Sequence, residues 1–91
     1  MTRSINTQEM QVLTRWLREQ REGLGLSMRE LGLRLGMPHS FVQKVELGER
    51  RLDLVEYVWY CRGLGIQPLN GLELVEGCMD SKLGTGQGFW N

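Results

Sequence analysis

Apolar residues recur along most of the chain at the three- and four-residue spacing of amphipathic helices, and glycine or proline interrupts them at intervals. Five helices are predicted, which begin close to the following residues: Asn6, Ser27, Pro38, Asp53 and Pro68. No stretch has the alternating pattern of a half-buried strand. We therefore expect an all-α protein, a compact bundle of four to five short helices.

The expected helix boundaries carry recognisable local chemistry. A capping residue followed three positions later by glutamate predicts a capping box at three starts: Asn6 with Glu9, Ser27 with Glu30, and Asp53 with Glu56. Thr7 is a second possible cap for the first helix. Proline suits the first helical position at the other two starts. Glycines are expected to end the first four helices, and the last helix is expected to end near Glu76.

One face of each helix carries the residues expected to form the core. These residues are Met10, Leu13, Leu17, Leu31, Leu35, Val42, Val45, Leu54, Tyr57, Val58, Cys61 and Leu64. We expect residues 1–76 to form one small domain. A glycine-rich tail, residues 77–91, would then be either flexible or docked on this domain.

Composition narrows the possible functions. The 91 residues have no net charge, so bulk charge gives no argument for nucleic acid. Two cysteines and one histidine match no zinc spacing, and no cysteine–histidine pairing, phosphate loop or carboxylate pair indicates catalysis. We expect no metal, no cofactor, no small-molecule effector and no enzymatic activity. No apolar run reaches membrane length, and the first residues, MTRSINTQEM, have no apolar core typical of a signal peptide. We therefore expect no membrane partner and a reduced, cytoplasmic protein.

The second and third predicted helices are the informative pair. Residues 27–35, a turn at Gly36–Met37 and residues 38–47 have the length and punctuation of a helix-turn-helix. Gly36 suits the left-handed turn position that such a motif needs. Gly32 stands inside the second helix, where glycine costs about 1 kcal/mol relative to alanine. We therefore expect it to allow the third helix to cross close by.

From Leu26 to Ile66, the sequence LSMRELGLRLGMPHSFVQKVELGERRLDLVEYVWYCRGLGI resembles the helix-turn-helix of the Cro/repressor class, the XRE family. The resemblance runs for 41 residues without a gap. It implies a lambda repressor-like DNA-binding domain and double-stranded DNA as the partner. It also implies that the third helix lies in the major groove, with its N-terminal half against base edges.

The resemblance places four polar residues where this helix would read bases: His39, Ser40, Gln43 and Lys44. Gln43 can bond the N6 and N7 atoms of adenine, and Lys44 can donate to the O6 and N7 atoms of guanine. Outside such a motif, these residues would be interpreted simply as a solvated helix face.

Flanking residues are candidates for phosphate contacts: Ser27, Met28, Arg29, Arg50 and Arg51. Amides at the start of the second helix form a natural anion site. Many relatives have glutamine where this chain has Met28, and methionine cannot make that polar contact. Arg21 and Glu46 match a pair that forms a structural salt bridge between the first and third helices in similar proteins.

Self-association is the expected support for so small a chain. Val55 and Trp59 are one turn apart on the fourth helix and lie off its core stripe, which suggests an exposed apolar patch. Leu69, Leu72 and Val75 could extend this patch into a homodimer interface. Alternatively, Phe89 and Trp90 fold back and cover it within one chain.

Three functions remain open at this stage. The leading hypothesis is a bacterial or phage transcriptional regulator, a repressor that binds an inverted-repeat operator as a homodimer. An antitoxin that also represses its own operon would need a surface for a toxin partner, and residues 67–91 are the spare segment for it. A protein-interaction module that has lost DNA binding is the third possibility.

Overall fold

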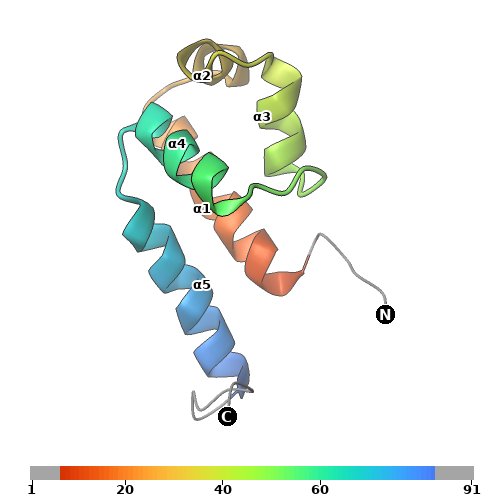
Figure 1. Cartoon of the computed structure of the whole chain (residues 1–91), viewed down its shortest axis with the longest axis vertical. Coiled ribbons are helices and arrows are strands. Elements are labelled where there is room, and N and C mark those ends of the chain that lie inside the picture. Colours follow the sequence, from red (N-terminus) through yellow and green to blue (C-terminus); the bar gives the residue numbers. More distant parts are fainter. Residues whose placement is uncertain (1–6, 84–91) are drawn as a thin grey trace.

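The computed structural model describes residues 7–83 as backbone and the side chains of residues 7–79. This part of the chain contains five helices and no strand: α1 (Gln8–Gly23), α2 (Met28–Leu35), α3 (His39–Glu46), α4 (Leu54–Leu64) and α5 (Pro68–Leu83) (Figure 1). The predicted all-α fold is therefore confirmed. None of the described helices is long and apolar enough to span a lipid bilayer.

Two of the three predicted capping boxes are present. In α2, the Ser27 side chain accepts from the Glu30 amide at 3.0 Å, and the Ser27 amide donates to the Glu30 carboxylate at 2.8 Å. Asp53 and Glu56 make the same reciprocal pair at the start of α4. At the first helix the Asn6–Glu9 box is wrong, because the other predicted cap, Thr7, is the one that the helix uses. Thr7 is the N-cap, and its hydroxyl accepts from the Met10 amide.

The other two starts differ in detail from the expectation. Pro38 precedes α3 as its N-cap and has extended backbone angles, so it is not the first helical residue. α5 begins at Pro68 as predicted but continues past Glu76 and through Gly77 to Leu83. A glycine inside a helix costs only about 1 kcal/mol relative to alanine, which does not stop a helix that packs along α1. Residues 84–91, with Phe89 and Trp90, lie outside the described residues.

The core lies between α1, α2, α3 and α4, each of which contributes side chains to it. Its buried side chains are Leu17, Leu31, Leu35, Phe41, Val42, Val45, Tyr57, Tyr60, Cys61 and Leu64. Leu54 was predicted to belong to this core but is 67% exposed, because it is the first residue of α4 and lies beyond the helices that cover the core. Tyr60, which the apolar stripe did not include, is fully buried.

α5 packs along α1 and touches α4 (Figure 1). Gly71 is the point of close approach, since a Cβ atom there would collide with the Tyr57 hydroxyl and the Trp16 ring. The Tyr57 hydroxyl donates to the Pro68 carbonyl at 2.5 Å, which ties the start of α5 to the core. α5 therefore extends the domain without covering the outer side of α2 and α3.

Candidate nucleic-acid interface

The turn between α2 and α3 is a tight, left-handed one. Gly36 has a φ of 70°, a conformation that glycine adopts without the steric cost of a side chain. The Met37 amide donates to the Gly32 carbonyl at 2.8 Å, so the chain reverses within one turn of the end of α2. These two features set where α3 begins.

Gly32 allows this turn to lie against α2. A Cβ atom at Gly32 would come within 2.6 Å of the Met37 carbonyl oxygen and 3.4 Å of the His39 amide nitrogen. The close approach predicted for this glycine is present, and the approaching atoms belong to the turn and the first residue of α3. Because they are backbone atoms, they cannot rotate away from a larger side chain.

The two sides of α3 differ sharply in chemistry. Phe41, Val42 and Val45 are buried, whereas His39, Gln43 and Lys44 are exposed. Ser40 is half-buried at the edge of the outward side. At about 100° of rotation per residue, the four polar residues share one arc of the helix surface. The structure thus brings together the four residues that the sequence selected as base readers.

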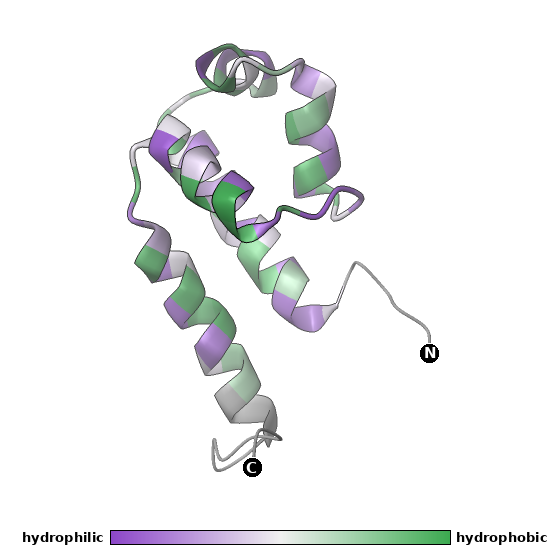
Figure 2. Cartoon of the chain, in the orientation of Figure 1, coloured by the Kyte–Doolittle hydropathy of each residue, from purple (hydrophilic) through white to green (hydrophobic). Residues whose placement is uncertain are grey.

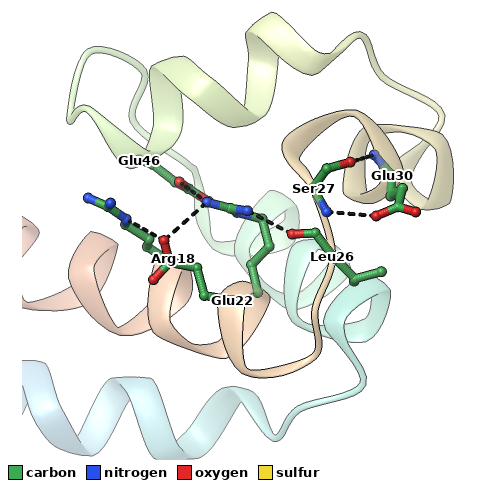
Figure 3. A network of polar contacts seen from close by, with 7 residues as sticks. Arg18, Glu22, Leu26, Ser27, Glu30 and Glu46 are labelled. Carbon is green, nitrogen blue, oxygen red and sulfur yellow. Dashed lines mark hydrogen bonds and ion pairs between the residues drawn. The ribbon is translucent and has the colours of Figure 1, made fainter.

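A buried ion pair holds the C-terminal end of α3 against α1. Arg21 donates to Glu46 twice, from Nε to Oε2 at 2.6 Å and from Nη2 to Oε1 at 3.1 Å. Its Nη1 atom donates to the Leu26 carbonyl at 2.7 Å (Figure 3). Both side chains are at least nine-tenths buried. The hydrogen bond with Glu46 raises the pKa of Arg21, which favours the charged guanidinium.

The N-terminus of α2 presents a mixed surface to a phosphate. Ser27 and Arg29 are exposed, but the Ser27 hydroxyl is already engaged as a helix cap. Met28 is half-buried and packs against the core, so its side chain serves packing. The Ser27 backbone amide lowers the pKa of Glu30 by donating to its carboxylate, which keeps a negative charge in the first turn.

Arg50 and Arg51 follow α3, as expected, but the two differ. Arg51 is exposed. Arg50 donates to both carboxylate oxygens of Glu56, from Nη2 at 2.6 Å and from Nη1 at 3.2 Å. Its guanidinium carbon also lies 5.4 Å from the centroid of the Phe41 ring. A DNA phosphate would have to compete with Glu56 for this side chain.

The residues predicted for a dimer interface lie on more than one surface. Val55 and Leu69 are 77% and 67% exposed. Trp59 is 38% exposed, and its ring packs against Phe41 of α3 with the centroids 6.3 Å apart. Leu72 and Val75 instead line an apolar groove of about 610 Å³ between α1, the start of α4 and α5.

Leu54, which was predicted to be in the core, and Leu74 of α5 add apolar surface that the sequence did not predict. Leu54 lines the same groove, and Leu74 is 41% exposed on α5. Figure 2 shows hydrophobic segments recurring along both α4 and α5. Because apolar residues surround these helices on several sides, the spacing alone could not separate core positions from exposed ones. Among the described residues, no group of histidine, cysteine and acidic side chains could hold a metal ion.

A short helix and a second helix that exposes polar side chains, joined by a left-handed turn, define a helix-turn-helix domain. The helix-turn-helix family model HTH_3 matches residues 17–68, which is more than half of the chain. This chain therefore belongs to the XRE family of helix-turn-helix proteins, a family of DNA-binding transcriptional regulators.

Solved structures agree with this assignment. An XRE-family like protein from Pseudomonas syringae pv. tomato is 43% identical, with a TM-score of 0.71 over 77% of this chain and 85% of that one. The restriction-modification controller protein C.AhdI from Aeromonas hydrophila is 32% identical, with a TM-score of 0.64 over 69% and 91%. The clp gene regulator ClgR from Corynebacterium glutamicum shares the fold, with a TM-score of 0.69 over 81% and 96% at 22% identity. Comparison with curated proteins gives no match.

Proposed function

We propose that this protein is a sequence-specific repressor, which binds an inverted-repeat operator as a homodimer. It represses through this binding, without an enzymatic activity. The outward side of α3 carries the proposal. It presents three exposed polar side chains and Ser40 beside them, while the opposite side of the helix is buried. A helix of this kind fits the major groove of B-DNA.

The chemistry of α3 supports direct readout of bases. The Gln43 amide can donate to and accept from adenine, and the Lys44 ammonium can donate to guanine. The Arg21–Glu46 ion pair supports the orientation of the helix from its other end. Arg29, Arg51 and the first amides of α2 would contact phosphates and set the register on the duplex.

A homodimer is proposed because exposed apolar side chains gather on α4 and α5. Val55, Leu54 and Leu69 are each at least two-thirds exposed, and Leu54, Leu72 and Val75 line the apolar groove. Exposed apolar surface of this kind is typical of interfaces. A two-fold dimer that binds adjacent half-sites needs its two α3 helices about 34 Å apart, one turn of the DNA helix.

Selection of bound duplexes from a random DNA pool tests the function directly. We expect an enriched inverted repeat whose half-sites lie about one helical turn apart. Gln43→Ala and Lys44→Ala should each weaken binding to that site by about 1–3 kcal/mol and relax the preference at one position per half-site. Gln8→Ala, an exposed glutamine at the start of α1, is the control. A pool that stays random after selection would reject sequence-specific binding.

Sedimentation at micromolar concentration tests the dimer. Val55→Glu should convert a dimer into a monomer, since an unpaired charge is costly to bury. Leu33→Glu is the matched control, because Leu33 on α2 is 76% exposed and Val55 is 77% exposed. A monomeric unaltered protein, or a Val55→Glu variant that stays dimeric, would rule out this interface.

A further inference from the structure

α3 and α4 are linked by a small cluster of side chains that the helix-turn-helix motif does not require. Phe41 extends from α3, and its ring lies 6.3 Å from the Trp59 ring and 6.1 Å from the Tyr60 ring, both on α4. The Arg50 guanidinium lies over the same ring at 5.4 Å. Phe41 is thus held between two aromatic side chains and a cation, arrangements that are favourable for each pair.

Glu56 fixes the position of that cation. Its carboxylate accepts from two nitrogens of Arg50 in the parallel geometry that suits a guanidinium. The same carboxylate accepts from the Asp53 amide as part of the capping box of α4. Glu56 therefore connects the loop after α3 to the capped first turn of α4.

The electrostatic surroundings of Arg50 disfavour a phosphate contact. Both of its terminal nitrogens donate to protein oxygens, since Nη1 also donates to the Arg51 carbonyl. The hydrogen bonds with Glu56 raise the pKa of Arg50, and the negative charge of Asp53 adds to this effect. Arg50 in turn lowers the pKa of Glu56. A phosphate at Arg50 would bring a third anion to this site.

We infer that Glu56 is a positioning residue for DNA reading, which holds Arg50 on Phe41 so that Arg50 fastens α3 to α4 instead of binding phosphate. The inference rests on the proposed function, because it concerns the helix that would read the bases. Glu56 and Arg50 then set the tilt of α3 from one side while Arg21 and Glu46 hold it from the other. Side chains that contact bases must be held within about 0.5 Å of their productive positions, which requires such support.

Three variants distinguish an Arg50 that fastens α3 to α4 from an Arg50 that binds phosphate. Glu56→Gln removes the charge but keeps an oxygen for the Asp53 amide, as glutamine also completes a capping box. Arg50→Gln removes the cation. Arg50→Lys keeps the charge for a phosphate but loses the planar, two-pronged contact with Glu56. Arg18→Gln is the control, because Arg18 pairs with Glu22 on the exposed surface of α1.

The measured quantity is the ratio of affinities for a duplex selected by the unaltered protein and for a scrambled duplex. We expect this ratio to fall about fivefold in all three variants, since mispositioning affects base contacts and spares phosphate contacts. Combining Glu56→Gln with Arg50→Gln should lower it no further, and Arg18→Gln should leave it unchanged. The dependence of log Kd on log salt should keep its slope in Arg50→Gln.

Other outcomes overturn the inference. If Arg50 binds phosphate, Arg50→Gln lowers both affinities equally and reduces the salt slope by about one, while Arg50→Lys and Glu56→Gln keep the ratio. Backbone amide NMR shifts in α3 give a readout without DNA. They should change in Glu56→Gln and Arg50→Lys but not in Arg18→Gln, and unchanged α3 shifts would also reject the positioning role. An unaltered protein that binds both duplexes equally would instead reject the proposed function.

Discussion

The turn between α2 and α3 depends on a few backbone atoms at short distances, whereas α4 and α5 present exposed apolar side chains. In the first region, a positive φ at Gly36 and the missing side chain of Gly32 determine the turn. In the second, Leu54, Val55 and Leu69 remain largely exposed on the described chain. The geometry of the first region is therefore determined within one chain, whereas the second region has exposed apolar surface that a second copy could cover.

The two regions depend on different kinds of contact, directional in the first and hydrophobic in the second. Polar and backbone contacts are directional, so the α2–α3 pair can hold side chains at defined positions for reading DNA. Hydrophobic contact is non-directional and depends on area, which suits assembly between copies. Substitutions that act on single atoms should therefore have large effects around α2 and α3 and small effects on α5.

The largest effect is expected from Glu46→Ala. It would leave the Arg21 guanidinium buried with only the Leu26 carbonyl and the more distant Glu22 carboxylate, 3.8 Å away. An unpaired buried charge of this kind costs about 3–5 kcal/mol of unfolding free energy. Denaturant unfolding with linear extrapolation measures the loss.

Two further variants sharpen this result. Arg18→Gln breaks an exposed Arg–Glu pair on α1 and should cost at most about 0.5 kcal/mol. Arg21→Met combined with Glu46→Leu removes both charges and should be less destabilised than Glu46→Ala. Equal losses in Glu46→Ala and Arg18→Gln would show that burial of the Arg21–Glu46 pair contributes nothing special.

Gly32→Ala should have the next largest effect, a loss of about 2 kcal/mol. Alanine favours the helix by about 1 kcal/mol, but its Cβ would lie 2.6 Å from the Met37 carbonyl oxygen, and backbone must move to relieve the contact. Thermal unfolding measures the loss, and amide NMR shifts should report movement at residues 37–39. A variant as stable as the unaltered protein would mean that the backbone of the turn moves at little energetic cost.

Directional contacts are also what the sequence predicted best. The capping boxes at Ser27 and Asp53 and the left-handed Gly36 each depend on a residue type at a fixed offset. The extent of α5 and the exposure of Leu54 depend instead on which surfaces the other helices cover. The Arg50–Glu56 contact joins a loop to a helix, and no local pattern in the sequence marks it.

Tyr60→Phe tests the core at a point where α4 buries a polar atom without a directional contact. The Tyr60 hydroxyl is buried and has no hydrogen-bond partner among the described residues, and burial raises its pKa. Removing a buried hydroxyl without a partner should stabilise the protein by up to about 1 kcal/mol. Leu17→Ala, at another fully buried core position, is the contrasting control and should lose about 2–5 kcal/mol. A clear loss in Tyr60→Phe would reveal a partner for the hydroxyl, such as a buried water.

Gly77→Ala is expected to have the smallest effect, and its sign is opposite to that of Gly32→Ala. Gly77 lies inside α5 and is exposed, and a Cβ atom added there would meet no atom within 4 Å beyond its own stretch of helix. Alanine there should stabilise the helix by about 0.5–1 kcal/mol through lower entropy of the unfolded chain and better helix propensity. Thermal unfolding of the Gly32→Ala and Gly77→Ala variants side by side gives the comparison. If Gly77→Ala destabilises the protein, α5 needs a close neighbour at this point, and a second copy of the chain packed on α5 would supply one.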